Sequence, residues 1–171
     1  MAATGQENIG YPFFAFAFSV EIRRPDVSSG PLCSAAFAEC DGLEMGMDVK
    51  TIREGGNNGS QIRLAGPRVY GTLTLKRGMT PSFDLWDWVR DSLEQPGLRA
   101  DISVVILNSV ARGAGARSPM ARFELSRCLP IKLKAPPLNA KDGMVAIEEL
   151  QVAYETLTFV RPNAPSGGGQ P

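Results

Sequence analysis

The sequence predicts a mainly β fold, a small antiparallel β-barrel or β-sandwich with one flanking α-helix. Several segments alternate between apolar and small or polar residues, which is typical of strands with one buried face. The 171 residues include 18 glycines and 13 prolines spread along the chain, so many turns are expected. Only one segment has a clear helical period. We expect a domain over residues 11–160, between a flexible N-terminus at 1–10 and a disordered Pro/Gly tail at 161–171.

The first predicted strand covers residues 14–23. Its apolar side chains fall on alternate positions, which predicts one buried face made of Phe14, Phe16, Phe18, Val20 and Ile22. The small residues between them either leave room for a second surface to approach or form a thin face toward solvent. Pro25 ends the element.

A second long strand is predicted over residues 35–53, with a turn or bulge at Asp41-Gly42. The next seven residues, 54–60, contain no core-forming side chain, and their asparagines and glycines tolerate positive φ. This segment is therefore a hairpin tip or a projecting loop, with phosphate binding by its amides a minor alternative. Strands over residues 61–65 and 69–77 follow.

The helix is predicted from Pro81 to Gln95, with Thr80 as its N-cap and Pro96-Gly97 as its stop. Its apolar stripe combines Leu85, Val89 and Leu93 with Trp86. Trp86 and Trp88 lie two positions apart, so they cannot both face the core squarely. We expect these two tryptophans to anchor the helix, one of them at a sheet edge or against a neighbour.

The remaining segments complete the predicted sheet. Residues 102–107 are apolar on both faces and predict a central strand covered from both sides. Residues 108–119 form a mobile connection, and 120–129 form a strand with inward side chains Ala121, Phe123 and Leu125. A proline-rich link with Pro130, Pro136 and Pro137 leads to residues 144–160. This last segment predicts a strand with a bulge near Glu148-Glu149, although Ile147, Leu150, Tyr154 and Leu157 also fit a helix.

Composition excludes several classes of function. The chain has no histidine, so a Ser-His-Asp or Cys-His nucleophile and a histidine zinc site cannot be built. Basic and acidic residues number 18 each, and this zero net charge argues against a general nucleic-acid binder. Cys33, Cys40 and Cys128 are interpreted as small buried hydrophobes. No segment is long and apolar enough for a membrane anchor, so cytoplasmic synthesis is expected.

Charged side chains offer few candidates for chemistry. Glu148, Glu149 and Glu155 are poor partners for acid-base catalysis because consecutive strand residues point to opposite faces. The helix carboxylates fit a solvated face as well as a metal site. We therefore expect no catalytic, metal-binding or cofactor-binding residue. These helix carboxylates are Asp84, Asp87 and Asp91, and a basic set expected at solvent or at an interface is Arg112, Arg117, Arg122 and Arg127.

Three blocks of sequence, taken in order, carry a family resemblance. The first is residues 42–49 running into 53–59, the second is 75–80 followed by 85–88, and the third is 138–140 with 145–150. Together they resemble the T4-type phage tail-tube proteins, a family that includes the inner-tube proteins of extracellular contractile injection systems. The haemolysin-coregulated (Hcp) protein of type VI secretion shares its plan. The resemblance extends over residues 11–159.

This resemblance implies a structural protein without enzymatic activity. It implies homohexameric rings that stack into a hollow tube inside a contractile sheath, in a particle or virion tail from which the tube is ejected on contraction. The implied partners are further copies of the chain, a sheath protein, baseplate or tube-initiator proteins and possible cargo in the lumen. The implied inter-ring contact loop comprises Arg53, Glu54, Gly55, Gly56, Asn57, Asn58, Gly59 and Ser60.

An alternative function uses the same fold without assembly. A monomeric β-barrel could bind a small apolar ligand in a cavity lined by Phe14, Phe16 and Phe18.

Overall fold

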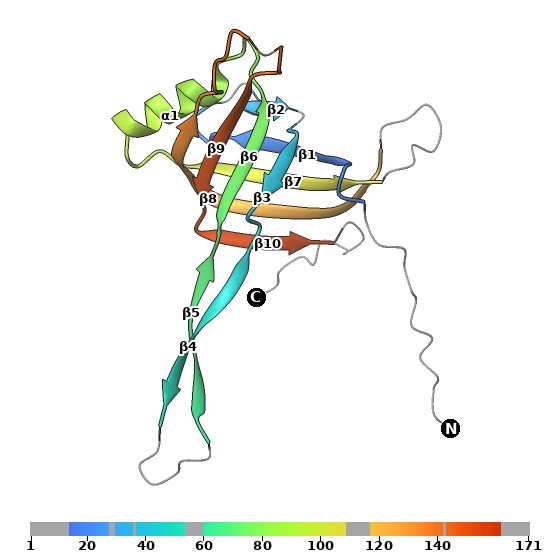
Figure 1. Cartoon of the computed structure of the whole chain (residues 1–171). Helices are drawn as coiled ribbons and strands as arrows, with labels where there is room; N and C mark the ends of the chain where they lie inside the picture. Colours follow the sequence, from blue (N-terminus) through green and yellow to red (C-terminus); the bar gives the residue numbers. More distant parts are fainter. Residues whose placement is uncertain are drawn as a thin grey trace, which may run out of the picture.

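A computed structural model describes residues 14–27, 30–35, 37–53, 60–108, 117–141 and 143–161 (Figure 1). These ranges contain ten strands and one helix, which confirms the mainly β fold with a single helix. The helix is α1 (Asp84–Glu94). The strands are β1 (Phe18–Arg23), β2 (Cys33–Ala35), β3 (Glu39–Asp41), β4 (Met45–Ile52), β5 (Ile62–Tyr70), β6 (Thr72–Gly78), β7 (Ala100–Leu107), β8 (Pro119–Lys134), β9 (Ile147–Ala153) and β10 (Thr156–Val160).

Eight strands form one antiparallel sheet in the order β2-β1-β7-β8-β9-β6-β3, with β10 also paired to β8. Strand β8 belongs to both halves of this sheet. Its residues 119–128 pair with β7, and its residues 129–134 pair with β9. Arg127, at the junction, has φ 54, which marks the change of direction. In Figure 1, β1, β7 and β10 run across the view while β9, β6 and β3 run steeply along it, so the two halves cross and enclose the core.

The core lies between the two halves of the sheet and beneath the helix. Val20, Ile22 and Ile102 enter it from one half, while Leu75 and Leu150 enter it from the other, and each is at most 1% exposed. Full burial of such a side chain contributes about 1.5–3 kcal/mol, so this core can support the fold of the domain body.

A buried ionic cluster joins the helix to the core face of β6 and β9. Arg77 Nε donates to Glu148 Oε1 at 2.7 Å, and Arg77 Nη2 donates to Asp84 Oδ1 at 2.5 Å. The indole of Trp86 donates to the second oxygen of Glu148 at 3.0 Å. Burial alone would raise the pKa of Asp84, but the hydrogen bond and the charge of Arg77 outweigh it and hold that pKa below its ordinary value.

The first strand is shorter than the alternation predicts. Phe14 and Phe16 precede β1 and are 58% and 67% exposed, while Ala17 is buried, so the prediction of a continuous buried face from Phe14 is wrong. The physical reason is pairing. Strand β7 ends at Leu107, whose N–H reaches Ala17 O at 2.8 Å, and no described strand continues beside residues 14–16.

The predicted strand over 35–53 is divided among β2, β3 and β4. The turn predicted at Asp41-Gly42 is confirmed, but it separates two different sheets. Gly42 has φ +87, and a Cβ there would lie 1.9 Å from Thr72 O, so only glycine fits. The strands predicted at 61–65 and 69–77 are also divided differently. Strand β5 covers the first of them and continues through Pro67 to Tyr70, and β6 covers most of the second. Their break falls between Tyr70 and Thr72.

The helix begins later and presents a different face than predicted. Phe83 occupies the N-cap position without a side-chain cap, so Thr80 and Pro81 do not start the helix. Leu93 is 79% exposed, whereas Trp88 is fully buried together with Leu85. Leu85, Trp88 and Ser92 form the buried face of the helix at spacings of three and four residues, and Leu93 lies beside this face.

The C-terminal half is more strand-rich than predicted. Pro130 lies inside β8 instead of in a link, and residues 147–160 form strands, as predicted over a helix. Their break falls at Tyr154-Glu155, not at Glu148-Glu149, because those glutamates stay in register opposite Arg77 and Lys76. Strand β7 has neighbours on both sides but buries one face, and Asp101 on its other face is exposed.

Three predicted segments lie wholly or mostly outside the described residues. They are the connection at 108–119, the N-terminus at 1–10 and the tail after 161.

Replacing Arg77 tests the buried ionic cluster. Arg77→Met leaves the carboxylate of Glu148, itself 2% exposed, without its cation, so we expect a loss of about 3–5 kcal/mol in the free energy of unfolding. Arg23→Met is the control, because the Arg23 side chain is 68% exposed beside Glu21, and we expect a loss below about 1 kcal/mol. Urea denaturation of the dispersed protein, followed by circular dichroism, measures both. Equal stability of the two variants would contradict the structural weight given to the cluster.

Candidate functional site

A long β-hairpin extends from the body of the molecule. Strands β4 and β5 pair with each other from Met45↔Tyr70 to Ile52↔Ile62 and join no other described strand. Figure 1 shows this ribbon continuing beyond β6 and β3, well away from the core. An isolated two-stranded ribbon is marginally stable in water, so packing against a further surface would stabilise this element.

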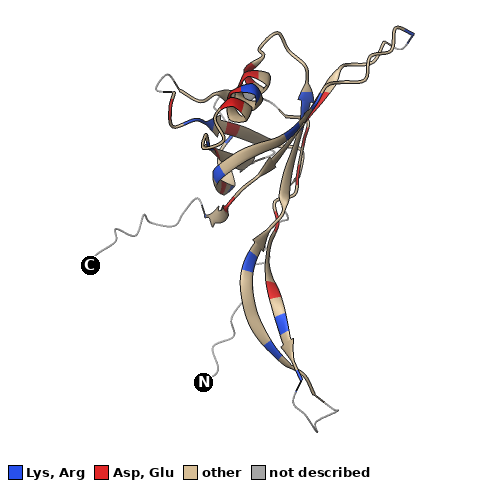
Figure 2. Ribbon diagram, turned by 90° about the vertical axis from the view of Figure 1, so that its left-hand side faces the viewer, with Lys and Arg blue, Asp and Glu red and all other residues tan. Residues whose placement is uncertain are grey.

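The ribbon exposes more apolar surface than an ordinary solvated hairpin. Seven large apolar side chains on it are between 40% and 63% exposed, and Figure 2 shows the ribbon as mostly uncharged with a few charged positions. Apolar residues lie on both faces near the tip. Side chains of this kind over a contiguous element mark a contact surface. They are Met45, Met47, Val49, Ile52, Ile62, Leu64 and Val69.

A tyrosine at the end of β9 fixes the base of the hairpin. The Tyr154 hydroxyl accepts the N–H of Glu44 at 3.0 Å and lies 2.9 Å from the carbonyl oxygens of Gly42 and Glu44. Its ring packs against Tyr70, with centroids 5.7 Å apart. Tyr154, at the break between β9 and β10, therefore contacts the chain just before β4 and the end of β5. Apart from its apolar spacing, no sequence pattern predicts this role for Tyr154.

The predicted contact loop, residues 53–60, falls in the sequence between the two strands of this hairpin. Arg53 and Ser60 are exposed and flank it, while Glu54, Gly55, Gly56, Asn57, Asn58 and Gly59 lie outside the described residues. The structure thus places the two ends of the predicted loop beyond the paired strands, and the expectation that residues 53–60 form a contact between rings stays a prediction.

The two tryptophans do not both face the core, as their spacing predicts, but Trp88 and not Trp86 joins the buried face of the helix. Trp88 is completely buried, and Trp86 is half-buried with its indole N–H bonded to Glu148.

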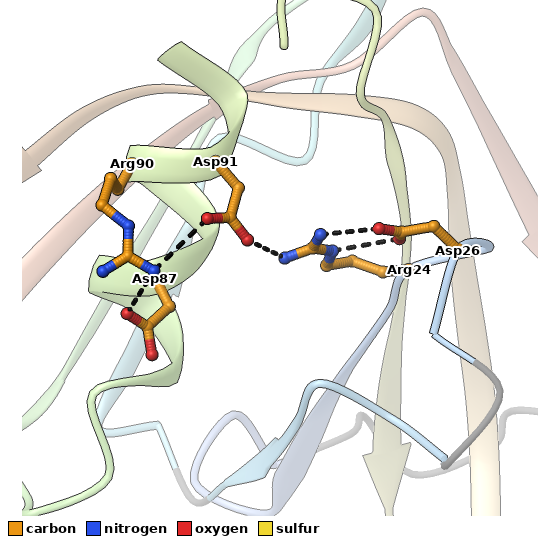
Figure 3. A network of polar contacts seen from close by, with 5 residues as sticks. All are labelled: Arg24, Asp26, Asp87, Arg90 and Asp91. Carbon is orange, nitrogen blue, oxygen red and sulfur yellow. Dashed lines mark hydrogen bonds and ion pairs between the residues drawn. The ribbon is translucent and has the colours of Figure 1, made fainter. Parts of the chain in front are cut away.

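A second polar network contacts the C-terminal half of the helix (Figure 3). Arg24, just after β1, donates hydrogen bonds to Asp91 at 2.8 Å and to Asp26 at 2.6 Å. Asp91 also accepts a hydrogen bond from Arg90. The hydrogen bond from Arg24 lowers the pKa of Asp91.

The candidate groups for chemistry are occupied by these structural contacts. Glu148 is bound by Arg77 and Trp86, while Asp84 and Asp91 are each paired with an arginine. Within the described ranges, no group of three or more cysteines and carboxylates could hold a metal ion. Burial raises the pKa of the Cys128 thiol to about 12, and burial with help from Asp41 raises that of Cys40 to about 11. These two thiols are therefore poor nucleophiles at neutral pH.

The ligand-binding alternative depends on a phenylalanine-lined cavity, and the structure contradicts that lining. Phe14 and Phe16 lie outside at 58% and 67% exposure, with their rings 5.7 Å apart. A hollow of about 260 Å³ on the outer face of β1, β7 and β8 is lined by charged groups such as Glu21, Arg23 and Arg122 instead.

Of the predicted basic set, Arg127 is bonded to Glu155 at 2.7 Å, Arg122 and Arg117 are exposed, and Arg112 is outside the described residues. In the described part of the chain, no helix has the length and apolar character needed to span a bilayer.

Known proteins share this architecture. Among solved structures, a chain in the anti-feeding prophage (AFP) baseplate, 6-fold symmetrised, superposes with a TM-score of 0.78 at 24% identity, covering 91% of this chain and 100% of that one. A chain in the sheath–tube complex of PVC, an extracellular contractile injection system in its extended state, gives 0.73 at 20% identity, with 94% and 99% covered. The E. coli EAEC 042 Hcp1 structure gives 0.50 at 9% identity, with 87% and 93% covered. These likenesses show the fold, and no curated protein matches the sequence.

The family follows from the sequence match. A family model described as T4-like virus tail tube protein gp19 matches residues 14–158, which is most of the chain. The match includes the projecting hairpin, the helix with its two tryptophans and the strands that close the core. The chain therefore belongs to the T4-like virus tail tube protein gp19 family.

Proposed function

We propose that this protein is the inner-tube subunit of a contractile injection system or phage tail, forming homohexameric rings that stack into a hollow tube inside a contractile sheath. The observation that carries this function is the β4–β5 ribbon, which extends from the body with both faces rich in exposed apolar side chains. Among the described strands of one copy, none pairs with this ribbon besides its own two. A second copy placed against the ribbon would remove that surface from water.

The solved relatives support the partners of this assembly. One lies in a baseplate reconstructed with six-fold symmetry, and another lies in a sheath–tube complex. A further relative, at 20% identity, lies in a cap that terminates a tube. By likeness, the partners of this chain are other copies of itself, a sheath protein and baseplate or tube-initiator proteins, with cargo possible in the lumen. Synthesis in the cytoplasm precedes assembly into the particle.

The residues assigned to this function are those of the ribbon, its tip and the helix. Residues Arg53 to Ser60 make the contact between rings, and the β4–β5 side chains pack on a neighbouring copy. Trp86 and Trp88 secure the helix to the body. The function needs no cofactor and no covalent chemistry, because these residues act only by packing.

Electron microscopy of the purified chain, alone and with sheath and baseplate components, tests the function directly. We expect hexameric rings or tubes. Met47→Asp/Val49→Asp places charge on two exposed ribbon positions, so it should abolish tubes while the melting temperature of dispersed protein stays within a few degrees of wild type. Met47→Leu/Val49→Ile keeps the apolar surface and should assemble normally. A compact wild-type monomer under all these conditions would contradict the function.

The tip is tested separately. Gly55→Val/Gly56→Val adds two branched side chains to the predicted inter-ring contact, so we expect rings to form but not to stack. Tube length in negative-stain images and ring mass by native mass spectrometry separate the two steps. Tubes of normal length from this variant would contradict the assignment of residues 53–60.

A further inference from the structure

An arginine occupies a strained backbone position where β8 changes its partner strand. Strand β8 pairs with β7 as far as Cys128 and with β9 from Leu129 onward, and Arg127 lies next to this change (Figure 1). Its φ of 54 is in the left-handed region, and no other non-glycine residue in the described ranges has a positive φ. Glycine adopts this conformation without strain, so an arginine here indicates a use for its side chain.

The side chain of Asp101 holds the main chain at this point, which we call the Arg127 corner (residues 126–128). Asp101 Oδ1 accepts a hydrogen bond from the N–H of Arg127 at 3.0 Å. The register of β7 with β8 shifts between Ala100 and Ile102, on either side of Asp101. The carboxylate therefore supplies a hydrogen-bond acceptor where the ladder between the two strands is irregular.

The Arg127 corner is also bonded to the break between β9 and β10. Arg127 Nε donates a hydrogen bond to Glu155 Oε2 at 2.7 Å, and the N–H of Glu155 donates one to the carbonyl oxygen of Ser126 at 3.2 Å. Arg99 Nε lies 3.8 Å from the other oxygen of the same carboxylate. Both the main chain and the side chain of Glu155 are therefore attached to the corner.

The residue before Glu155 contacts the base of the ribbon. Tyr154 is buried, and its hydroxyl lies 2.9 Å from Gly42 O and accepts the N–H of Glu44. Its ring packs against Tyr70 at the end of β5. A continuous series of contacts thus leads from β7, through the Arg127 corner and the β9–β10 break, to the base of the ribbon.

We propose that Arg127 is a positioning residue, which holds Glu155 and, through Tyr154, fixes the direction in which the ribbon leaves the body. The strained conformation is retained because glycine, which would relieve the strain, has no side chain to bind Glu155. This direction is a property of a single copy. Only its consequence for assembly rests on the proposed function, because stacked rings need ribbons that point the same way in every copy.

This role differs from a contribution to stability. The Arg127 and Glu155 side chains are 63% and 51% exposed, and exposed ion pairs contribute little to the free energy of unfolding. Replacing Arg127 by glycine also removes the backbone strain. We therefore expect Arg127→Gly to stay folded, with a melting temperature within a few degrees of wild type, while its ribbon loses its fixed direction.

The distance between one label on the ribbon and one on the body measures this direction. Spin labels at Arg68→Cys, near the base of the ribbon, and Glu94→Cys, at the end of the helix, occupy exposed positions. A Cys40→Ser background removes the half-buried thiol, and Cys33 and Cys128 are buried. In dispersed protein, double electron–electron resonance should give one narrow distance distribution.

Two variants break the contact from either side. Arg127→Gly and Glu155→Ala should each shift or widen the distribution, and the double variant should do so no more than Glu155→Ala alone. Glu124→Ala is the matched control, because Glu124 is 50% exposed and lies 3.9 Å from Arg122, outside the corner. It should leave the distribution unchanged. In assembly, Arg127→Gly should need about fivefold more protein than wild type to form tubes.

The outcomes separate this inference from the proposed function. An unchanged distribution in both corner variants would show that Arg127 does not position the ribbon, even if wild type forms tubes. An equal change in Glu124→Ala would show that the effect is not specific to the corner, and would also overturn the inference. If wild type forms no tubes but only the corner variants shift the distribution, the function fails and the positioning role stands. Circular dichroism of each dispersed variant controls for folding.

Discussion

One constraint matters most for this molecule. Within the described part of one copy, the large apolar side chains of the β4–β5 ribbon are not buried in the core. Among the described strands, the ribbon pairs with no third strand, and its seven large apolar side chains are between 40% and 63% exposed in a single copy. The body is different, because its two half-sheets and helix enclose leucine, isoleucine and tryptophan almost completely. One copy therefore combines a buried core with a projecting ribbon whose apolar side chains are exposed. This combination suits a subunit of a tube.

The body supports the projection through a few polar contacts at its joints. Arg77 binds the helix to β6 and β9, Arg24 binds the far end of the helix to the chain after β1, and the Tyr154 hydroxyl holds the base of the hairpin. Buried ion pairs add little net stability compared with apolar packing, but they penalise alternative arrangements that leave a charge unpaired. These contacts join the helix and the base of the hairpin to the sheet.

Much of this architecture could be predicted from the sequence, because strand alternation and turn residues are local signals. The turn at Gly42, the strands around Leu73 and Leu150, and the rule that Trp86 and Trp88 cannot both face the core follow from such signals. The errors have nonlocal causes. Among the described strands none pairs beside Phe14, Trp88 and not Leu93 lies on the buried face of the helix, and Pro130 continues β8 where β9 pairs with it. The family resemblance, not periodicity, supplied the function, and the tip residues that it names lie outside the described chain.

Backbone hydrogen exchange tests most directly whether the fold is completed by neighbouring copies. In dispersed protein, amides of β4 and β5 should exchange far faster than those of β6 and β9, because the ribbon has no layer above it. In assembled tubes, the same ribbon amides should become as protected as those of the body. Ribbon amides that are fully protected in dispersed protein and unchanged by assembly would contradict the account.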